Sequence, residues 1–536
     1  MKGTWKKAFA VLSVLLLLMA AACGKPADGS SEDTAGSSGK EQERTTEAPQ
    51  APREITVDGS AGYTANGGIF QGWGTSMCWW ANRIGYDDTL AEIAAKAFCD
   101  TEEGLGLNIF RYNIGGGDDP THDHITRTDS VMPGYWADPV VDDAGAPLSW
   151  DYDWDKDANQ RNVLQKIVKA SGDDLIVEAF SNSPPYFMTV SGCSSGGELP
   201  NRNNLRADAV DAFAAYLADV AEHFDSEWGV RFESISPMNE PDTRYWSAFS
   251  DKQEGCHVDP GEAQSEILTA LRKALDERGL EDVILSGTDE TSIDKQINSL
   301  KKLTPEALEA IGRVDTHTYG GSMRTELRDA AAAAGKNLWM SEVDGGDVIG
   351  SGEMGAALWL AKRITDDMNG LNPSAWILWQ VIDSHISSVG MNNHQDGGMV
   401  NTSGGYWGTT VMDHDKKELV LTMKYYAFGQ FTRYIRPGSR LLQSEENIVS
   451  AVSPDGKELV IVMVNEEARE KPVHAAFKEL NVAAGQDVRV IRTSGDIASG
   501  EHWKELEPVK SEENGLSTVL APSSVTTFIL PLENGQ

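Results

Sequence analysis

The chain has 536 residues, of which 40% are hydrophobic and 24% charged, and its formal net charge at pH 7 is −36. This length is enough for a large core and for more than one domain. The acidity argues against nucleic acid or an anionic lipid surface as a partner, and it suits a neutral or cationic substrate.

The N-terminus predicts an exported protein. Lysines near the start precede an apolar run that ends in small residues before Cys23, a pattern typical of a signal peptide over residues 1–22. This run is too short to span a bilayer comfortably. The sequence AAAC ahead of Gly24 resembles a lipobox, so Cys23 would be the lipidated first residue of a lipoprotein on the outside of a bacterial cell membrane; ordinary secretion is the alternative.

Residues 23–53 contain almost no large apolar group. Such a segment cannot bury enough surface to offset its ordering entropy, so it predicts a disordered tether. We therefore expect contact with the membrane only through the lipid anchor.

Between residues 67 and 419, short apolar runs alternate with amphipathic helical segments such as 207–224 and 260–278. The eight strand candidates are residues 70–80, 107–116, 174–185, 231–241, 282–290, 313–321, 337–346 and 374–383. This alternation predicts a (β/α)8 barrel. An open dinucleotide-binding sheet is disfavoured because no early G-x-G-x-x-G opens a helix.

After about residue 420 the pattern changes to short strands separated by turns, with a hairpin signal at Pro454-Asp455-Gly456. Residues 53–59, before the barrel, are also strand-like. We predict a β-sandwich packed beside the barrel and built from residues 54–66 and 420–536.

Reactive side chains of such a barrel lie at the C-terminal ends of its strands. Glu240 lies near the C-terminal end of the fourth strand candidate and Glu342 near that of the seventh. Paired carboxylates across one barrel mouth are what retaining glycoside hydrolysis needs. We expect Glu342 to be the nucleophile, kept ionised by Arg111, and Glu240 to be the acid/base. Asn-Glu-Pro alone is a weak signal, because Pro241 could simply end the strand.

Other residues at these strand ends are candidates for sugar binding, since indole rings stack on the apolar faces of sugars and hydroxyls need polar partners. These candidates are Trp73, Trp79, Trp80, Arg111, Asn113, Asp118, Asn239, His317, Tyr319 and Trp379, with Trp246, Tyr406 and Trp407 in or beside the same loops. Asn239 would contact the sugar 2-hydroxyl.

Several of these candidates have a structural alternative. His317 and Tyr319 could be core residues satisfied by the backbone, and Asp118 could cap a loop. The adjacent Trp79 and Trp80 face opposite sides of a strand, so one of them could belong to the core.

Four further cysteines follow Cys23. Cys78 and Cys99 lie in apolar contexts typical of buried thiols, whereas Cys193 and Cys256 lie in polar, glycine-rich loops. Because export permits disulfides, Cys193 and Cys256 are a candidate pair. No Cys/His spacing predicts a metal site, and we expect neither a metal nor an organic cofactor.

Seven stretches together resemble glycoside hydrolase family 30 over about residues 54–535: GWGTSMCWWAN, FRYNIGGGDDP, SNSPPYFMT, SPMNEPD, THTYGG, WMSEVDGG and FTRYIRPGS. The resemblance implies a retaining barrel with a side β-sandwich, Glu240 as acid/base and Glu342 as nucleophile. It also implies that Arg111 and Asn239 contact the nucleophile and the sugar.

The double tryptophan and the stretch SPPYFMTVSGCSSGG look most like the endo-β-1,6-galactanase branch, which cuts β-1,6-galactan side chains of arabinogalactan. A retaining hydrolase of β-1,6-glucan or xylan is one alternative, and a non-catalytic glycan-binding lipoprotein is another. The sequence does not decide between hydrolysis and transglycosylation, or between endo and exo cutting. It also does not indicate whether arabinose branches on the glycan are tolerated or which oligomeric state the protein adopts.

Overall fold

The computed structural model describes residues 51–346, 353–391 and 407–533. The predicted signal peptide, Cys23, nearly all of the predicted tether and Tyr406 lie outside these residues. Within the described ranges, no helix has both the length and the apolar character needed to cross a bilayer.

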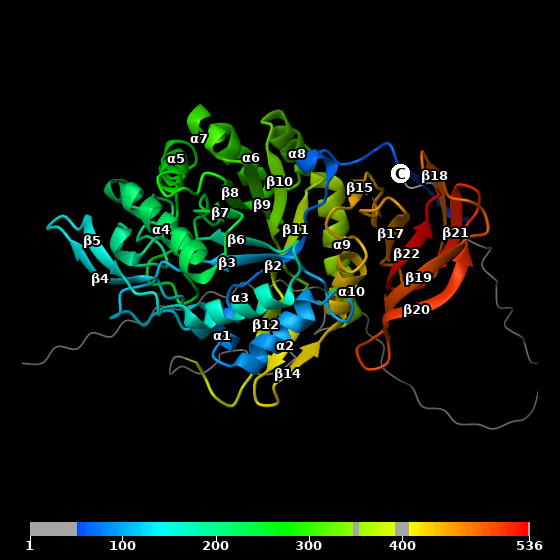
Figure 1. The fold of residues 1–536 in the computed structure, drawn as a ribbon, viewed down its shortest axis with the longest axis horizontal. Helices are drawn as coiled ribbons and strands as arrows, with labels where there is room; N and C mark the ends of the chain where they lie inside the picture. The colour runs from blue at the N-terminus through cyan, green and yellow to red at the C-terminus, as the bar shows by residue number, and fades with distance from the viewer. Residues whose placement is uncertain (1–50, 347–352, 392–406, 534–536) are drawn as a thin grey trace, which may run out of the picture. The chain divides into compact units, whose positions relative to one another are not determined.

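Eight parallel strands close a barrel in the order β10-β11-β2-β3-β6-β7-β8-β9 (Figure 1). Each strand begins inside one of the predicted stretches, and β8 runs two residues beyond its stretch, so the predicted barrel is confirmed. The strands are β2 (Gly72–Ser76), β3 (Ile109–Asn113), β6 (Ile176–Phe180), β7 (Ser234–Ser236), β8 (Ile284–Ser292), β9 (Arg313–Gly320), β10 (Asn337–Glu342) and β11 (Ala375–Gln380).

Helices cover the outside of the barrel because each one buries an apolar face. Helix α4, for example, buries Phe213, Leu217 and Phe224 and ends at Gly229, whose φ of 66° is left-handed. The helices that follow successive barrel strands are α1 (Trp80–Ile84), α2 (Asp88–Cys99), α3 (Ala158–Ala170), α4 (Val210–Trp228), α5 (Glu262–Asp276), α6 (Ile293–Lys302), α7 (Pro305–Ala310), α8 (Arg324–Ala333) and α9 (Met354–Leu371).

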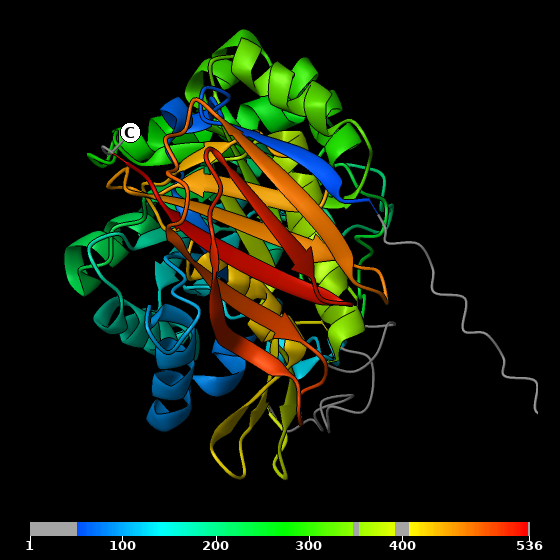
Figure 2. The same cartoon turned by 90° about the vertical axis from the view of Figure 1, so that its right-hand side faces the viewer.

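The C-terminal strands form two sheets beside the barrel (Figure 2). A six-stranded sheet has the order β15-β16-β17-β22-β19-β20, and a three-stranded sheet has the order β1-β18-β21. Strand β1 (Arg53–Asp58) pairs in parallel with β18 (Lys471–Lys478), so the N-terminal strand joins the C-terminal segment as predicted. The remaining strands are β15 (Arg440–Leu442), β16 (Ile448–Val452), β17 (Glu458–Asn465), β19 (Asp487–Ser494), β20 (Glu501–Lys510), β21 (Gly515–Leu520) and β22 (Ser524–Pro531).

The segment after residue 420 is not entirely β, because it contains helix α10 (Met423–Thr432). Phe428 and Phe431 of this helix pack on Trp73 of the barrel, with ring centroids 6.2 and 6.1 Å away. Since almost the whole surface of α10 is buried, it lacks the two-faced pattern by which a surface helix is found in a sequence.

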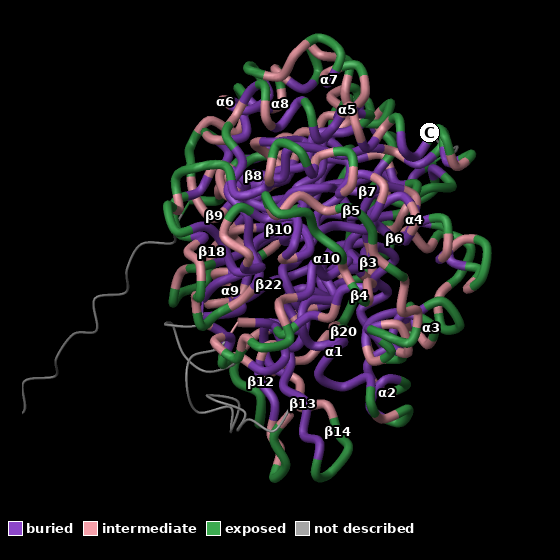
Figure 3. The backbone as a smooth tube through the Cα atoms, turned by 90° about the vertical axis from the view of Figure 1, so that its left-hand side faces the viewer, coloured by how far each residue is buried: buried purple, intermediate pink, exposed green. Residues whose placement is uncertain are grey.

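Two small sheets complete the fold. Strands β4 (Trp136–Val141) and β5 (Pro147–Tyr152) form a hairpin, and β12 (Ile382–Ile386), β13 (Thr410–Asp413) and β14 (Glu418–Leu421) form a three-stranded sheet. Figure 3 shows the buried backbone gathered in the centre, with the exposed segments around it.

Candidate active site

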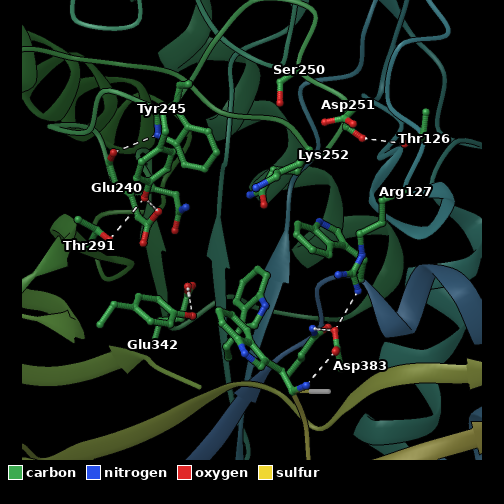
Figure 4. A pocket seen from close by; sticks show the side chains of 18 residues that line it. Thr126, Arg127, Glu240, Tyr245, Ser250, Asp251, Lys252, Thr291, Glu342 and Asp383 are labelled. Atoms are coloured by element: carbon green, nitrogen blue, oxygen red, sulfur yellow. Dashed lines mark hydrogen bonds and ion pairs between the residues drawn. The ribbon is translucent and has the colours of Figure 1, made fainter. Parts of the chain in front are cut away.

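A pocket of about 900 Å³ opens at the ends of the barrel strands. Glu240 follows β7, Glu342 is the last residue of β10, and Trp379 lies near the end of β11. Parallel strands bring their C-terminal ends to one rim, so residues far apart in sequence meet there. Figure 4 shows Glu240 and Glu342 on one side of this pocket and Arg127 with Asp383 on the other.

The structure brings Glu240, His317 and Glu342 into one cluster, with one polar atom of each within 4.8 Å of the others. His317 Nδ1 lies 3.0 Å from Glu240 Oε1 and 3.4 Å from Glu342 Oε1, while its Nε2 lies 3.2 Å from Asp289 Oδ1. These three groups are close enough to hold a cation. A protonated imidazole between carboxylates accounts for the same contacts.

Arg111 lies beneath the cluster and is fully buried. Its guanidinium donates to Glu178 Oε1 at 2.7 Å, to Asp289 Oδ2 at 2.5 Å and to Glu342 Oε2 at 3.4 Å. A buried charge needs such partners, because water cannot solvate it. The predicted contact between Arg111 and Glu342 is therefore present, although Arg111 shares its charge among three carboxylates.

Each glutamate also accepts a hydrogen bond from a tyrosine. Tyr319 Oη donates to Glu342 Oε1 at 3.1 Å, and Tyr245 Oη donates to Glu240 Oε2. The backbone of Glu240 is left-handed, with φ of 48°, and its N–H donates to the carbonyl of Asp289 at 2.8 Å. A non-glycine residue in this region is strained and is often found at functional sites.

The surroundings move the pKa values of the two carboxyl groups apart. Burial and the negative charge of Glu240 raise the pKa of Glu342 to about 7, against the lowering effects of His317 and Arg111. Burial also acts to raise the pKa of Glu240. The hydrogen bond and charge of His317, together with the hydrogen bond from the Tyr245 hydroxyl, outweigh this effect, so the pKa of Glu240 lies below its ordinary value. The pair therefore holds one proton close to neutral pH.

The charge on His317 follows from the same contacts. Burial lowers the pKa of His317, but the negative charges of Glu342 and Asp289, and hydrogen bonds to Asp289 and Glu240, raise it well above its ordinary value. The imidazole is thus a donor to both sides. It is buried, as one alternative expected, but its partners are the carboxyl groups of the site.

Aromatic side chains line the pocket beyond the glutamates. Trp79 and Trp379 pack edge to face with ring centroids 5.1 Å apart, and Trp407 stacks on Tyr319 at 5.8 Å. The Arg127 guanidinium lies over Trp79, 4.6 Å from the ring, and forms an ion pair with Asp383 at 3.1 Å. These rings offer faces on which sugars can stack.

Asn239 and Trp246 also line the pocket. The Asn239 side-chain oxygen is buried and has no hydrogen-bond partner among the described residues. An unpaired buried acceptor is costly. Asn239 is thus placed to accept a hydrogen bond from a bound hydroxyl group.

Four predicted sugar-binding residues lie elsewhere. Trp73 and Trp80 are fully buried in the core, where their indole N–H groups donate to the carbonyls of Ile435 and Ser76. Trp80 faces the core because helix α1 begins there, so strand alternation does not apply. The other two residues, Asn113 and Asp118, are outside the pocket lining; Asn113 is fully buried, and Asp118 contacts His122 and His124.

The predicted disulfide is wrong, because Cys193 and Cys256 are both free. Their loops are adjacent, since the N–H of Gly255 donates to the carbonyl of Ser194 at 2.9 Å. The side chains point to different partners: Cys193 Sγ lies 3.2 Å from Ser195 Oγ, while Cys256 Sγ lies 3.7 Å from the carbonyl of His257. Adjacent loops do not suffice when the Cβ directions diverge.

The sequence reasoning missed Asp289 and Tyr245. Asp289 lies on β8, and the strand-end rule that found Glu240 and Glu342 could have found it. Tyr245 belongs to the long loop after β7, and no periodic pattern marks it there.

Comparisons with known proteins bear on the family and the fold. Residues 60–300 match the family model for O-glycosyl hydrolase family 30, and residues 255–414 match that for glycosyl hydrolase family 59. The structure of a family 30 subfamily 8 xylanase from Clostridium acetobutylicum superposes with a TM-score of 0.62 and 17% identity, covering 89% of this chain and 99% of that one.

Two curated relatives are more similar in sequence. The endo-beta-1,6-galactanase of Hypocrea rufa is 30% identical over 495 residues, which cover 89% of this chain and 95% of the relative. The exo-beta-1,6-galactobiohydrolase of Bifidobacterium longum subsp. longum is 27% identical over 86% of this chain, which spans only 38% of that longer protein. The chain belongs to O-glycosyl hydrolase family 30 and is an O-glycosyl hydrolase.

Proposed function

We propose that this protein is a retaining hydrolase that cleaves β-1,6-galactan side chains of arabinogalactan, with Glu342 as nucleophile and Glu240 as acid/base. The observation that carries the proposal is the placement of these two carboxyl groups, whose nearest oxygens are within 4.8 Å at the pocket floor. Retaining enzymes place their carboxyl groups about 5 to 5.5 Å apart, whereas inverting enzymes leave room for a water molecule at about 6.5 to 9.5 Å.

In the first step, Glu342 attacks the anomeric carbon while Glu240 gives its proton to the leaving glycosidic oxygen. In the second step, Glu240 takes a proton from water, and that water releases the sugar from Glu342 with retained configuration. The unpaired oxygen of Asn239 accepts a hydrogen bond from a sugar hydroxyl beside the reacting carbon.

In the site without substrate, the raised pKa of Glu342 and the lowered pKa of Glu240 place the shared proton on Glu342. The first step requires that proton on Glu240. The two groups are coupled, so a proton that moves to Glu240 removes the negative charge that raises the pKa of Glu342. Arg111 and Tyr319 then stabilise the ionised Glu342. We assign Glu342 as the nucleophile because Arg111 and Tyr319 donate hydrogen bonds to its carboxylate. Glu240 is then the acid/base.

The substrate assignment is supported by the two curated relatives, whose names both specify a β-1,6 linkage and galactose units. The aromatic pocket fits a neutral polysaccharide or oligosaccharide. The net charge of −36 would instead repel polyanionic glycans.

The test is product analysis after incubation of the purified protein with de-arabinosylated arabinogalactan, β-1,6-glucan and xylan, with Glu240→Gln and Glu342→Gln as controls. Release of β-1,6-galacto-oligosaccharides by the wild-type protein alone supports substrate and site together. Cleavage of β-1,6-glucan or xylan instead would refute the substrate assignment, and binding without any cleavage would refute the catalytic one.

A further inference from the structure

A second cluster of metal-ligating side chains lies outside the catalytic pair. Asp118, His122 and His124 belong to the loop that follows β3, and Cys193 belongs to the loop that follows β6. One donor atom of each lies within 4.8 Å of the others. None of the four lines the pocket, so sugar binding does not account for their convergence.

Two separations in this cluster, both from His124, fall within the range expected for the edges of a metal-centred tetrahedron. With Zn–N bonds of about 2.0 Å and a Zn–S bond of about 2.3 Å, tetrahedral ligand atoms lie about 3.3 to 3.7 Å apart. His124 Nε2 lies 3.5 Å from Asp118 Oδ2 and 3.6 Å from Cys193 Sγ. His122 Nδ1 lies 3.2 Å from Asp118 Oδ1, and Cys193 Sγ lies 3.9 Å from Asp118 Oδ2.

We propose that Asp118, His122, His124 and Cys193 bind one Zn²⁺ ion. Two imidazoles, one thiolate and one carboxylate are a donor set that suits zinc, whereas Ca²⁺ and Mg²⁺ take oxygen ligands. The side chains of Asp118, His122 and His124 are 14, 22 and 13% exposed, so an ion can enter, while Cys193 is fully buried.

Neighbouring groups support the donors from outside. The N–H of Ser194 donates to Asp118 Oδ1 at 3.1 Å, and the N–H of Phe249 donates to Cys193 Sγ at 3.3 Å. The Phe249 ring also packs edge to face on both imidazoles, with centroids 5.0 and 5.3 Å away. Such contacts orient ligands and shield a metal from water.

A polar network without metal is the competing explanation. Ser195 Oγ lies 3.2 Å from both His124 Nε2 and Cys193 Sγ, so a hydroxyl group could link these side chains. The two explanations differ in one measurable respect, since only a metal site takes up an equivalent of zinc.

The cluster adjoins the wall of the pocket. Thr126 and Arg127, two and three residues after His124, line the pocket, and so do Ser250 and Asp251, which directly follow Phe249. The N–H of Thr126 donates to the carbonyl of Asp251 at 3.0 Å, so the two wall segments are already joined. A zinc ion would fasten both segments to the Cys193 loop. Its removal should lower the Tm of the whole protein and loosen a wall remote from Glu240.

The experiment measures zinc in the full-length purified protein by mass spectrometry of the metal, before and after chelation and re-addition of Zn²⁺. We expect one equivalent in the wild type, a fall in Tm on chelation, and loss of that equivalent in Cys193→Ser and in His124→Ala. Cys256→Ser, a matched change at another buried free cysteine, should keep the zinc.

Folding of the variants is checked by circular dichroism, and His122→Ala, at the most exposed ligand, is the milder variant if the others unfold. Co²⁺ in place of zinc should give thiolate charge-transfer absorption that disappears in Cys193→Ser. No stoichiometric zinc uptake by the wild type, or equal uptake by folded ligand variants, would overturn the proposal. So would zinc lost in Glu342→Gln but kept in the cluster variants, which would place the ion at the catalytic pair.

Discussion

Replacing Tyr319 by phenylalanine isolates one hydrogen bond of the catalytic site. The change removes the hydroxyl that donates to Glu342 Oε1 at 3.1 Å and keeps the ring that stacks on Trp407. A hydrogen bond to a charged group contributes about 1.5 to 3 kcal/mol. Because 1.36 kcal/mol corresponds to about one pKa unit, the loss should raise the pKa of Glu342 by about 1 to 2 units.

This shift should appear in the pH dependence of kcat/KM. Glu342 carries the last proton of the pair, so the alkaline limb of the profile should move up by about 1 to 2 pH units, and the maximum should fall because a larger share of the singly protonated sites holds the proton on Glu342. The assay is initial-rate hydrolysis of β-1,6-galactan across the pH range. Tyr245→Phe is the matched control: it removes the donor to Glu240, the first of the pair to lose its proton, and should raise the acidic limb instead. An alkaline limb that does not move in Tyr319→Phe would refute the reasoning.

Three further predictions follow from the same structure. In the product assay, Glu240→Gln should lower kcat/KM by about 10²- to 10⁴-fold, which is the usual contribution of general acid–base catalysis. Glu342→Gln should show no turnover in the same assay. A near-normal rate for either variant would contradict the assigned roles. The pKa of Glu342 is about 7, so the two glutamates lose their last proton near neutral pH. We therefore expect kcat/KM, measured across the pH range, to fall as the pH rises through about 7. A value that rises there would contradict the claim that the two glutamates share one proton. Cys23→Ser should move the protein from the membrane fraction to the soluble fraction on cell fractionation if Cys23 carries the anchor, and unchanged partition would rule the anchor out.

The barrel and the proposed catalytic pair could be predicted from the sequence because both depend on local rules. All eight barrel strands begin in stretches that the apolar pattern marked, and the strand-end rule placed Glu240, Glu342 and Arg111 together. The same rule gave no information on side-chain direction. It therefore grouped Trp73 with Trp79, although Trp73 packs under α10 and only Trp79 lines the pocket.

The features that the sequence did not reveal depend on how loops converge. The predicted pairing of Cys193 with Cys256 failed because each thiol points to a different neighbour, although their loops are adjacent. The ligand cluster was not visible as a Cys/His spacing, because Cys193 is 75 residues from Asp118. Only the folded barrel brings the two loops together.

The central claim is that Glu342 forms a covalent bond to the sugar. The most direct test is mass spectrometry of proteolytic peptides after incubation with a 2-deoxy-2-fluoro-β-galactoside that carries a good leaving group, since such a reagent accumulates a glycosyl-enzyme. The account predicts one labelled peptide, with the sugar on Glu342, and no label in Glu342→Gln. A label on Glu240, or turnover of natural substrate with inverted configuration, would contradict it.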